Sequence, residues 1–216
     1  MSSNPHLADF GLSAVVAANV DLPRPIGKPA WRALVRRRNR ARDRNVATRH
    51  GAAAAEMLGN LAAYLDARVV ALYSPLGTEV DTRPLANALL VQGRALVYPR
   101  LQRDGVTIDM CQCDGPANLA ARPRSRLLEP VGAVVQPDAI DLVIVPAMAV
   151  TPQLARLGRG GGSYDRYLSA VSESVPVVAL VAADCVIPWG PMEKHDAVVD
   201  AVMTENGLFV AAPRDV

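Results

Sequence analysis

The amino-acid sequence predicts an α/β protein in which helices and strands are layered on one another. Three short runs, at 68–73, 141–146 and 175–181, are rich in β-branched residues and apolar on both faces, which is typical of strands buried in a parallel sheet. Segments with the apolar spacing of helices separate these runs. Strands that alternate with helices along a chain indicate an α/β layered fold.

The length of 216 residues suits one sizeable domain with a core of its own. Half of the residues are hydrophobic and only 4% are aromatic, so we expect a core built from alanine, valine and leucine. Residues 1–26 contain three prolines and show no apolar period, which predicts a poorly ordered N-terminal arm. Residues 27–216 are expected to form a single α/β domain.

Composition and charge argue against several classes of protein. A net charge of +2 is too small to indicate a nucleic-acid partner. No apolar run is long enough to span a bilayer, and no basic segment precedes the short apolar patch at 12–18, as a secretory signal requires. The three cysteines, Cys111, Cys113 and Cys185, lack zinc-site spacing, so we expect reduced thiols. The expected location is therefore the cytoplasm.

A first helix is predicted to open at 27–29, because proline is well tolerated in a first helical turn. One face of this helix carries Trp31, Leu34, Val35 and Arg38. Another face carries three cations, Lys28, Arg32 and Arg36, which lie four residues apart and can meet one ligand together.

A run of arginines continues along this helix and beyond it: Arg36, Arg37, Arg38, Arg40, Arg42 and Arg44. Such a run can bind RNA or a membrane surface, and it can also be the solvated face of a helix. No aromatic residues interleave with the arginines to stack on bases. The pattern favours the solvated face, with an RNA-binding helix at 36–44 as the alternative.

The other predicted elements follow in chain order. An alanine-rich helix over 47–66 is expected to bury Met57, Leu58, Leu61 and Leu65. Beyond the strand at 68–73 we expect a helix at 84–91, a strand at 95–98, an edge or hairpin strand at 107–110, an irregular segment at 127–130, the strand at 141–146, a helix at 164–171, the strand at 175–181 and a last strand at 197–199.

The loop from Ser74 to Thr82 follows the first predicted sheet strand. Open α/β sheets bind ligands beyond the carboxyl ends of their strands, so this loop is a candidate binding segment. Glu79 lies within it. Its carboxylate can bind the amino or amide groups of a heterocycle, or it can be an ordinary helix-capping or surface acid.

The stretch from Arg156 to Arg166, RLGRGGGSYDR, concentrates the chemistry of the chain. Its four glycines permit positive φ and close approach of a ligand to the backbone, whose N–H groups can form an anion-binding concavity. Arg156, Arg159 and Arg166 can pair with phosphate oxygens, and Asp165 can hold Mg²⁺. These groups together favour a site of phosphoryl transfer.

The same stretch is open to other interpretations. Glycines before a helix can form a simple turn. A P-loop is excluded because no lysine follows Gly162, and a dinucleotide fingerprint is excluded because Ser163 stands where its last glycine belongs. Further along, His195 by itself is typical of a loop or core histidine, and Asp196 is a candidate for a second metal ligand.

Six segments, in this order, resemble those of the 5-formyltetrahydrofolate cyclo-ligase (methenyltetrahydrofolate synthetase) family. The resemblance runs from Lys28 to about Gly207, and the glycine-rich stretch is its most specific part. The segments are Lys28-x-x-x-Arg32, Tyr73 to Thr82, Tyr98-Pro99-Arg100, Leu128-Glu129-Pro130, Arg156-Leu157-Gly158-x-Gly160-x-Gly162-x-Tyr164-Asp165, and His195-Asp196 with Asp200.

The resemblance implies a three-layer α/β/α sandwich with a mostly parallel central sheet. It also implies an ATP- and Mg²⁺-dependent ligase that converts 5-formyltetrahydrofolate into 5,10-methenyltetrahydrofolate, with release of ADP and phosphate. We expect a monomer whose partner is this small-molecule folate, with no nucleic acid and no membrane.

The resemblance also assigns roles to residues. The ATP-binding residues it implies are Lys28, Arg32, Arg156, Leu157, Gly158, Arg159, Gly160, Gly161, Gly162, Ser163 and Tyr164. The folate-binding residues are Ser74, Glu79, Arg159, Gly160, Gly161, Gly162 and Ser163. Asp165 and Asp196 are the implied magnesium ligands, and Arg159 is the expected catalytic residue, because it can stabilise charge on the transferred phosphoryl group.

Two departures from the family pattern bear on the substrate. Many relatives have a second tyrosine where this chain has Ser163, and Phe-Asp where it has Val150-Thr151. Loss of aromatic side chains can loosen stacking on the pterin ring. An altered relative that binds ATP but acts on another substrate, or is non-catalytic, is therefore the alternative.

Overall fold

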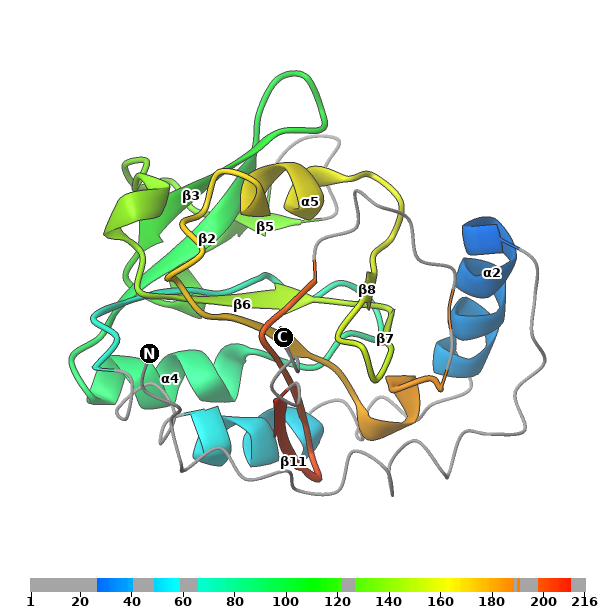
Figure 1. Ribbon diagram of the computed structural model, residues 1–216. Coiled ribbons are helices and arrows are strands. Elements are labelled where there is room, and N and C mark those ends of the chain that lie inside the picture. Colours follow the sequence, from blue (N-terminus) through cyan, green and yellow to red (C-terminus); the bar gives the residue numbers. More distant parts are fainter. Residues whose placement is uncertain are drawn as a thin grey trace.

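The computed structural model describes residues 27–40, 49–58, 66–121, 127–188, 190 and 198–210. Within these ranges helices surround one seven-stranded sheet (Figure 1). Several predictions fall outside them: the arm at 1–26 and the roles of Arg42, Arg44, Leu61, Leu65, His195 and Asp196.

The central sheet has the strand order β11-β10-β9-β6-β1-β2-β3. Its neighbours pair in parallel from β10 to β2 and antiparallel at both edges. The mostly parallel sheet is as predicted. The strands are β1 (Val69–Ala71), β2 (Ala95–Leu101), β3 (Ile108–Cys113), β6 (Leu142–Pro146), β9 (Val177–Leu180), β10 (Ala201–Thr204) and β11 (Gly207–Val210).

Helices cover both faces of the sheet and make the three predicted layers (Figure 1). α4 (Arg83–Val91) and the helical segment at 49–58 lie on one face, where Leu85 joins the core. α5 (Ser163–Leu168) lies on the other face, where Tyr167 packs into a second apolar cluster. Because strands such as β6 are covered on both sides, their side chains are apolar on both faces.

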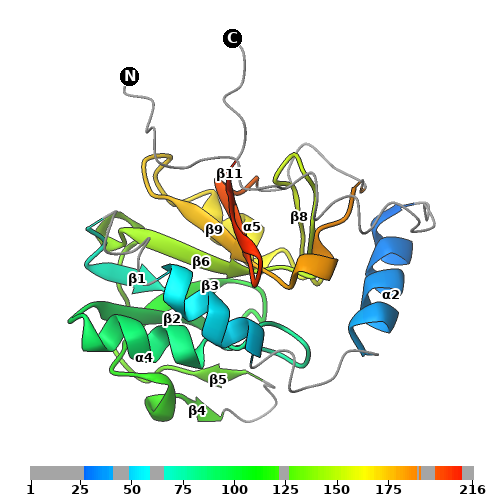
Figure 2. The ribbon, with the colours of Figure 1, turned by 90° about the horizontal axis from the view of Figure 1, so that it is seen from below.

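α2 (Gly27–Arg40) lies beside the sheet rather than on it (Figure 2). It packs against a small hairpin made of β7 (Ala149–Val150) and β8 (Arg156–Leu157). Trp31 and Val35 are buried there, as their spacing predicts. This packing holds α2 next to the glycine-rich loop that follows β8.

The last strand was predicted in the wrong place. The sequence pattern indicated 197–199, but the strand is β10, at Ala201–Thr204. Val198 makes only an isolated bridge with Ala155. The apolar run continues past 199, and the register with β9, in which Val178 lies opposite Ala201, selects its later part. The edge strand β11 was not predicted.

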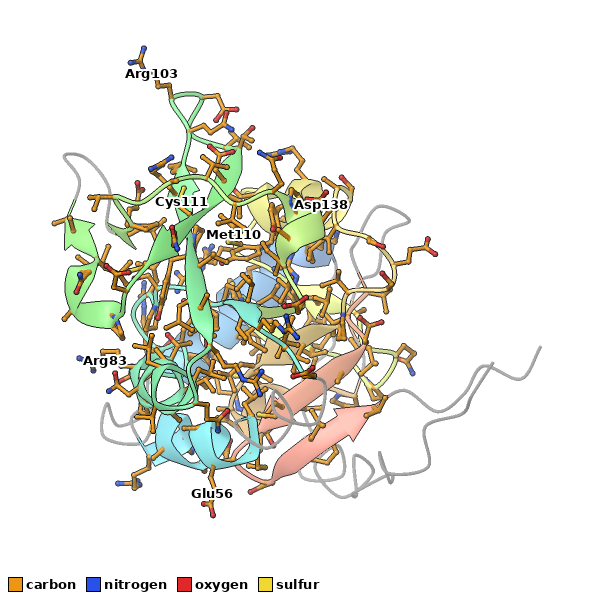
Figure 3. The ribbon with its side chains drawn as sticks, turned by 90° about the vertical axis from the view of Figure 1, so that its left-hand side faces the viewer. Glu56, Arg83, Arg103, Met110, Cys111 and Asp138 are labelled. Carbon is orange, nitrogen blue, oxygen red and sulfur yellow. The ribbon has the colours of Figure 1, made fainter. Side chains whose placement is uncertain are left out.

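Smaller differences lie near the other edge of the sheet. The segment at 127–130, predicted to be irregular, contains β5 (Leu128–Glu129), which pairs with β4 (Ala120–Ala121). The predicted edge strand is confirmed as β3, and the β2–β3 hairpin carries Arg103 away from the body of the molecule (Figure 3). Three short 3₁₀ helices complete the described fold: η1 (Pro116–Asn118), η2 (Pro137–Ala139) and η3 (Ala183–Cys185).

The three cysteines are buried and form no disulfide bond, as expected from their spacing. Among the described residues, no helix has both the length and the apolar character needed to cross a membrane.

Gly51 marks a close approach that fixes the helix at 49–58 against the loop after β1. A Cβ built at Gly51 would lie 2.3 Å from the carbonyl oxygen of Asp81. We expect Gly51→Ala to destabilise the fold by about 1–2 kcal/mol, because overpacking outweighs the gain in helix propensity of about 1 kcal/mol. Urea unfolding measures the change.

The matched control is Ala52→Ser, which enlarges an exposed side chain of the same helix and should change the free energy of unfolding by less than about 0.5 kcal/mol. A Gly51→Ala protein as stable as the parent would contradict this account of the contact.

Candidate active site

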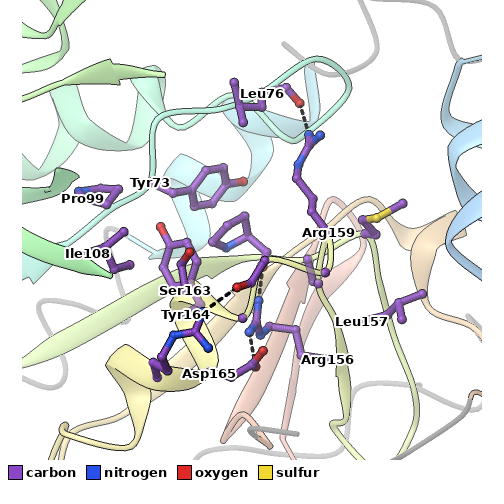
Figure 4. A pocket seen from close by; sticks show the side chains of 18 of the residues that line it. Tyr73, Leu76, Pro99, Ile108, Arg156, Leu157, Arg159, Ser163, Tyr164 and Asp165 are labelled. Carbon is purple, nitrogen blue, oxygen red and sulfur yellow. Dashed lines mark hydrogen bonds and ion pairs between the residues drawn. The ribbon is translucent and has the colours of Figure 1, made fainter. Parts of the chain in front are cut away.

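One cavity of about 850 Å³ lies where α2, the loops after β1 and β8, and the ends of β2 and β3 meet (Figure 4). It is lined by Lys28, Arg32, Ser74, Glu79 and every residue from Arg156 to Arg166. β1 and β6 are parallel neighbours, so the segments beyond their carboxyl ends emerge at the same edge of the sheet. The structure therefore brings together every predicted site residue that it describes.

The glycine-rich loop needs glycine at two positions where arginines lie close to its backbone. Gly160 has φ +106° and Gly162 has φ +70°. A Cβ at Gly160 would lie 3.2 Å from the guanidinium carbon of Arg32, and one at Gly162 would lie 3.2 Å from the Nη1 of Arg166. Arg32 also donates from Nε to the carbonyl of Gly158 at 3.0 Å. The loop is held by these contacts while residues 159–161 stay exposed.

Arg156 is a structural arginine at the base of the loop. Only 3% of its side chain is exposed. It donates from Nη2 to the Asp165 carboxylate at 2.5 Å and from Nη1 to the Pro146 carbonyl at 3.2 Å. Its guanidinium also lies 5.6 Å from the ring centre of Tyr164. These contacts tie β6, β8 and α5 together.

Arg159 joins the glycine-rich loop to the loop after β1. Its Nε donates to Glu79 Oε1 at 2.7 Å and its Nη2 donates to the Leu76 carbonyl at 2.6 Å (Figure 4). Glu79 is 9% exposed and Arg159 is 49% exposed. Burial raises the pKa of Glu79, and the charge of Arg159 partly offsets this rise. A half-exposed cation therefore neutralises a buried carboxylate inside the cavity.

Two tyrosines form a neutral wall of the cavity. Burial raises the pKa of both Tyr73 and Tyr164 above the ordinary value, so both phenols stay protonated. Tyr73 donates its hydroxyl proton to the Val80 carbonyl at 2.9 Å. The buried Tyr164 hydroxyl has no hydrogen-bond partner in the described part of the chain. It can therefore pair with a molecule that enters the cavity.

The predicted metal site is only partly described. Asp165 lines the cavity, but one of its oxygens accepts the hydrogen bond from Arg156. Asp196 lies outside the described residues. Over the ranges that the structure covers, no three His, Cys, Asp or Glu side chains gather as a metal cluster would. The role of the two aspartates as magnesium ligands stays a prediction.

The basic run on α2 contributes to the same region. Arg36, an exposed member of the run, donates from Nη2 to the Arg159 carbonyl at 3.5 Å. Arg37 and Arg40 are exposed, as the solvated face of a helix would be. Part of the run thus supports the glycine-rich loop.

Sequence reasoning missed several residues of the cavity. The Leu76 and Pro146 carbonyls hold arginines, and backbone acceptors carry no signal in the sequence. Leu101 and Ile108 form an apolar wall from β2 and β3. Their alternation predicts burial but does not indicate that they face a ligand. Pro99, which belongs to a matching motif, also lines the cavity.

Comparison with known families gives a match over most of the chain. The sequence model of the 5-formyltetrahydrofolate cyclo-ligase family matches residues 25–205. The chain is similar to the 5-formyltetrahydrofolate cyclo-ligase of Mycolicibacterium smegmatis, with 33% identity over 68% of this chain and 78% of that protein. It is also similar to the enzyme of the same name from Escherichia coli K12, with 27% identity over 82% of this chain and 99% of that protein.

Solved structures give the same result for the fold. The NMR structure of Aquifex aeolicus 5,10-methenyltetrahydrofolate synthetase superposes with a TM-score of 0.74 and 28% identity, covering 88% of this chain and 94% of that chain. A 5,10-methenyltetrahydrofolate synthetase from Mycoplasma pneumoniae has a TM-score of 0.68 at 19% identity, covering 83% of this chain and 99% of that chain. The latter likeness concerns the fold alone.

The buried ion pair at the base of the loop gives a prediction about stability. We expect Arg156→Met to lower the free energy of unfolding by about 2–3 kcal/mol, because it leaves the Asp165 carboxylate and the Pro146 carbonyl without their donor. Urea unfolding measures the change. Arg103→Met, at the exposed tip of the β2–β3 hairpin, is the matched control and should cost less than about 0.5 kcal/mol. Equal stability of the two variants would refute the structural role of Arg156.

Proposed function

The chain belongs to the 5-formyltetrahydrofolate cyclo-ligase family and is a cyclo-ligase, and we propose that it uses ATP and Mg²⁺ to close 5-formyltetrahydrofolate to 5,10-methenyltetrahydrofolate. The observation that carries this proposal is the cavity of the candidate active site. It places a cation-lined glycine loop opposite a buried carboxylate. The proposed enzyme acts as a cytoplasmic monomer on a small folate, without a nucleic-acid or membrane partner.

The glycine-rich loop fits a triphosphate. Its exposed backbone at 159–161 carries no side chain larger than hydrogen at Gly160 and Gly161, so phosphate oxygens can come close to the backbone. Lys28 and Arg32 line the same cavity from α2 and supply positive charge. Arg159 adds a guanidinium whose side chain is half exposed. These groups support the proposed ATP site from Arg156 to Tyr164.

Another part of the cavity lining fits a heterocycle. Glu79 is a buried carboxylate that can accept hydrogen bonds from ring N–H and amino groups, and Ser74 also lines the cavity. Tyr73, Tyr164 and Ile108 provide flat and apolar surface. Many relatives have a second tyrosine where this chain has Ser163. The ring of Tyr164 lines the cavity and partly compensates for that missing aromatic side chain.

Asp165 is the described residue that would contact Mg²⁺, and Asp196 is proposed as the second ligand. The oxygen donor set suits this hard cation. Bound Mg²⁺ would neutralise phosphate charge in the way common to phosphoryl-transfer enzymes. Arg156 pairs with only one oxygen of Asp165. The other oxygen of that carboxylate can therefore bind the metal.

The chemistry explains why the site needs positioning more than a nucleophile of its own. A formamide is a poor electrophile, so the γ-phosphoryl group is proposed to pass from ATP to the formyl oxygen, with the bond to the β–γ bridging oxygen breaking and ADP leaving. N10 then attacks the formyl carbon. The carbon–oxygen bond breaks, phosphate departs with the former formyl oxygen, and the N10 proton passes to phosphate or solvent. The role of Arg159 is to stabilise charge on the moving phosphoryl group.

The experiment that tests the proposal follows the absorbance of the methenyl product with 5-formyltetrahydrofolate and ATP present. The proposal expects product only when ATP and Mg²⁺ are both supplied. An altered relative would bind ATP and form no product, whereas an RNA-binding protein would show affinity for RNA that falls steeply with salt.

Arg159→Ala should reduce kcat by about 10³-fold or more, because a positioned arginine contributes at least that much to phosphoryl transfer. Arg103→Ala, at an exposed position of the β2–β3 hairpin that is not among the cavity residues, is the matched control and should keep full turnover. Circular dichroism checks that both variants fold. Near-normal turnover of Arg159→Ala would remove this residue from the mechanism.

The raised pKa of Glu79 predicts a dependence of folate binding on pH. Burial disfavours the charged carboxylate, so Glu79 begins to take up a proton at a pH above its ordinary pKa of 4.5. Protonated Glu79 has no negative charge with which to bind the heterocycle. The KM for 5-formyltetrahydrofolate should therefore rise as the pH falls toward 4.5. In Glu79→Gln, which does not titrate, KM should be higher throughout but flat over the same range.

A rise in pH favours folate binding by Glu79 but lowers the contribution of this residue to the stability of the fold. The folded protein holds the Glu79 proton more tightly than the unfolded chain does, so this group lowers the free energy of unfolding as the pH rises from 4.5 through its raised pKa.

Parallel pH profiles of KM in the parent and Glu79→Gln would contradict the assignment of Glu79 to the heterocycle.

A further inference from the structure

Arg159 does two things that conflict within one reaction. The proposed mechanism needs its guanidinium on the transferred phosphoryl group. In the structure its Nε donates to Glu79 Oε1 at 2.7 Å and its Nη2 donates to the Leu76 carbonyl at 2.6 Å. The second Glu79 oxygen accepts from the Leu76 N–H at 2.7 Å. Arg159, Glu79 and Leu76 thus form a closed set of contacts across the cavity.

The contacts weaken Arg159 as a partner for phosphate. The Nε–Nη2 edge of a guanidinium can pair with an anion through two parallel hydrogen bonds, and here both of its nitrogens are already donating. The carboxylate beside it also cancels its charge. A phosphate that enters the cavity therefore meets a neutral pair rather than a free cation.

Burial makes the two partners unequal. Glu79 is only 9% exposed, and leaving a buried carboxylate without a donor is costly. Arg159 is 49% exposed, so water can solvate its guanidinium once it leaves. The pair should therefore open when another donor reaches Glu79, and stay closed when none is present.

We infer that Glu79 is a positioning residue for Arg159, and that the heterocycle of the formyl substrate releases this arginine onto the nucleotide by replacing it at the carboxylate. The inference rests on the proposed function, in which Glu79 receives the ring N–H groups. Binding of the substrate then completes the site for phosphoryl transfer.

Two consequences follow for the nucleotide. Substrate and nucleotide bind with positive coupling, and this coupling is reciprocal for the two affinities. Without the heterocycle, the ion pair keeps Arg159 from the nucleotide, and hydrolysis of ATP by water is therefore slower. In that side reaction, water attacks the γ-phosphorus, the bond to the β–γ bridging oxygen breaks, and ADP, phosphate and a proton are released. The ion pair thus protects ATP from water when no acceptor is bound.

The first experiment measures affinity for a non-hydrolysable ATP analogue by calorimetry, with and without saturating 5-formyltetrahydrofolate. In the parent protein, we expect the folate to tighten analogue binding by about fivefold or more. In Glu79→Gln, which keeps the shape of the side chain and removes its charge, the analogue alone should bind about fivefold more tightly than it binds the parent alone. Damage to the fold would weaken binding rather than tighten it.

The second experiment measures phosphate release from ATP without folate. Glu79→Gln should hydrolyse ATP about tenfold faster than the parent, a fraction of what a fully positioned arginine supplies. Glu79→Gln/Arg159→Ala should lose this gain. The matched control is Asp81→Asn, which removes a carboxylate from the same loop whose partner, Arg83, is not among the cavity residues. Its analogue affinity and hydrolysis should equal those of the parent.

The inference is overturned if Glu79→Gln binds the analogue no more tightly than the parent and hydrolyses ATP no faster. It is also overturned if Asp81→Asn shows the same gains. Failure of the proposed function looks different: the parent would form no methenyl product and show no folate effect, whereas the gain of analogue affinity in Glu79→Gln depends only on the release of Arg159.

Discussion

The close approach of arginine side chains to the glycine-rich backbone is the constraint on which the site depends. The guanidinium of Arg32 lies against Gly160 and that of Arg166 against Gly162, each 3.2 Å from the place of a Cβ, so a larger residue at either position would push the arginine aside. Arg32 donates to the Gly158 carbonyl and Arg166 donates to the Gly161 carbonyl at 2.7 Å. These contacts hold carbonyl groups of the loop from α2 and α5. The exposed part of the loop can therefore be fixed in position without being buried.

Sheet topology explains why residues far apart in the sequence meet at this loop. β1 and β6 run in parallel, with Ala71 opposite Val143, so the chain leaves both strands at one edge of the sheet. The loop after β1 supplies Glu79, and the β7–β8 hairpin after β6 leads to Arg159, 80 residues further along the chain. The hairpin also packs against α2 through apolar contacts and so holds this helix near the loop. One edge of the sheet thus receives an acid, a glycine loop and a helix with basic residues.

Much of this arrangement could be predicted from the sequence, because the signals are local. Apolar runs identify β1, β6 and β9, and the spacing of Trp31 and Val35 identifies the buried face of α2. The last strand, β10, was misplaced because an apolar run does not indicate which of its residues pair with a neighbouring strand. That register is set by the pairing with β9. The partners of the arginines could not be predicted either, since the Leu76 and Pro146 carbonyls carry no signal and the pairings depend on tertiary packing.

The three arginines of the loop look alike in the sequence, and burial separates their roles. Arg156 is 3% exposed and binds a carboxylate and a carbonyl beneath the loop, so moving it would uncover buried polar groups. Arg166 is exposed in the last turn of α5, yet it donates to the Gly161 carbonyl and so supports the loop. Arg159 alone of the three pairs across the cavity while half of its side chain meets water. It is therefore the arginine of the three that can change partners within the cavity once another donor reaches Glu79. A site that must neutralise charge during one step of a reaction needs such a residue next to two that stay in place.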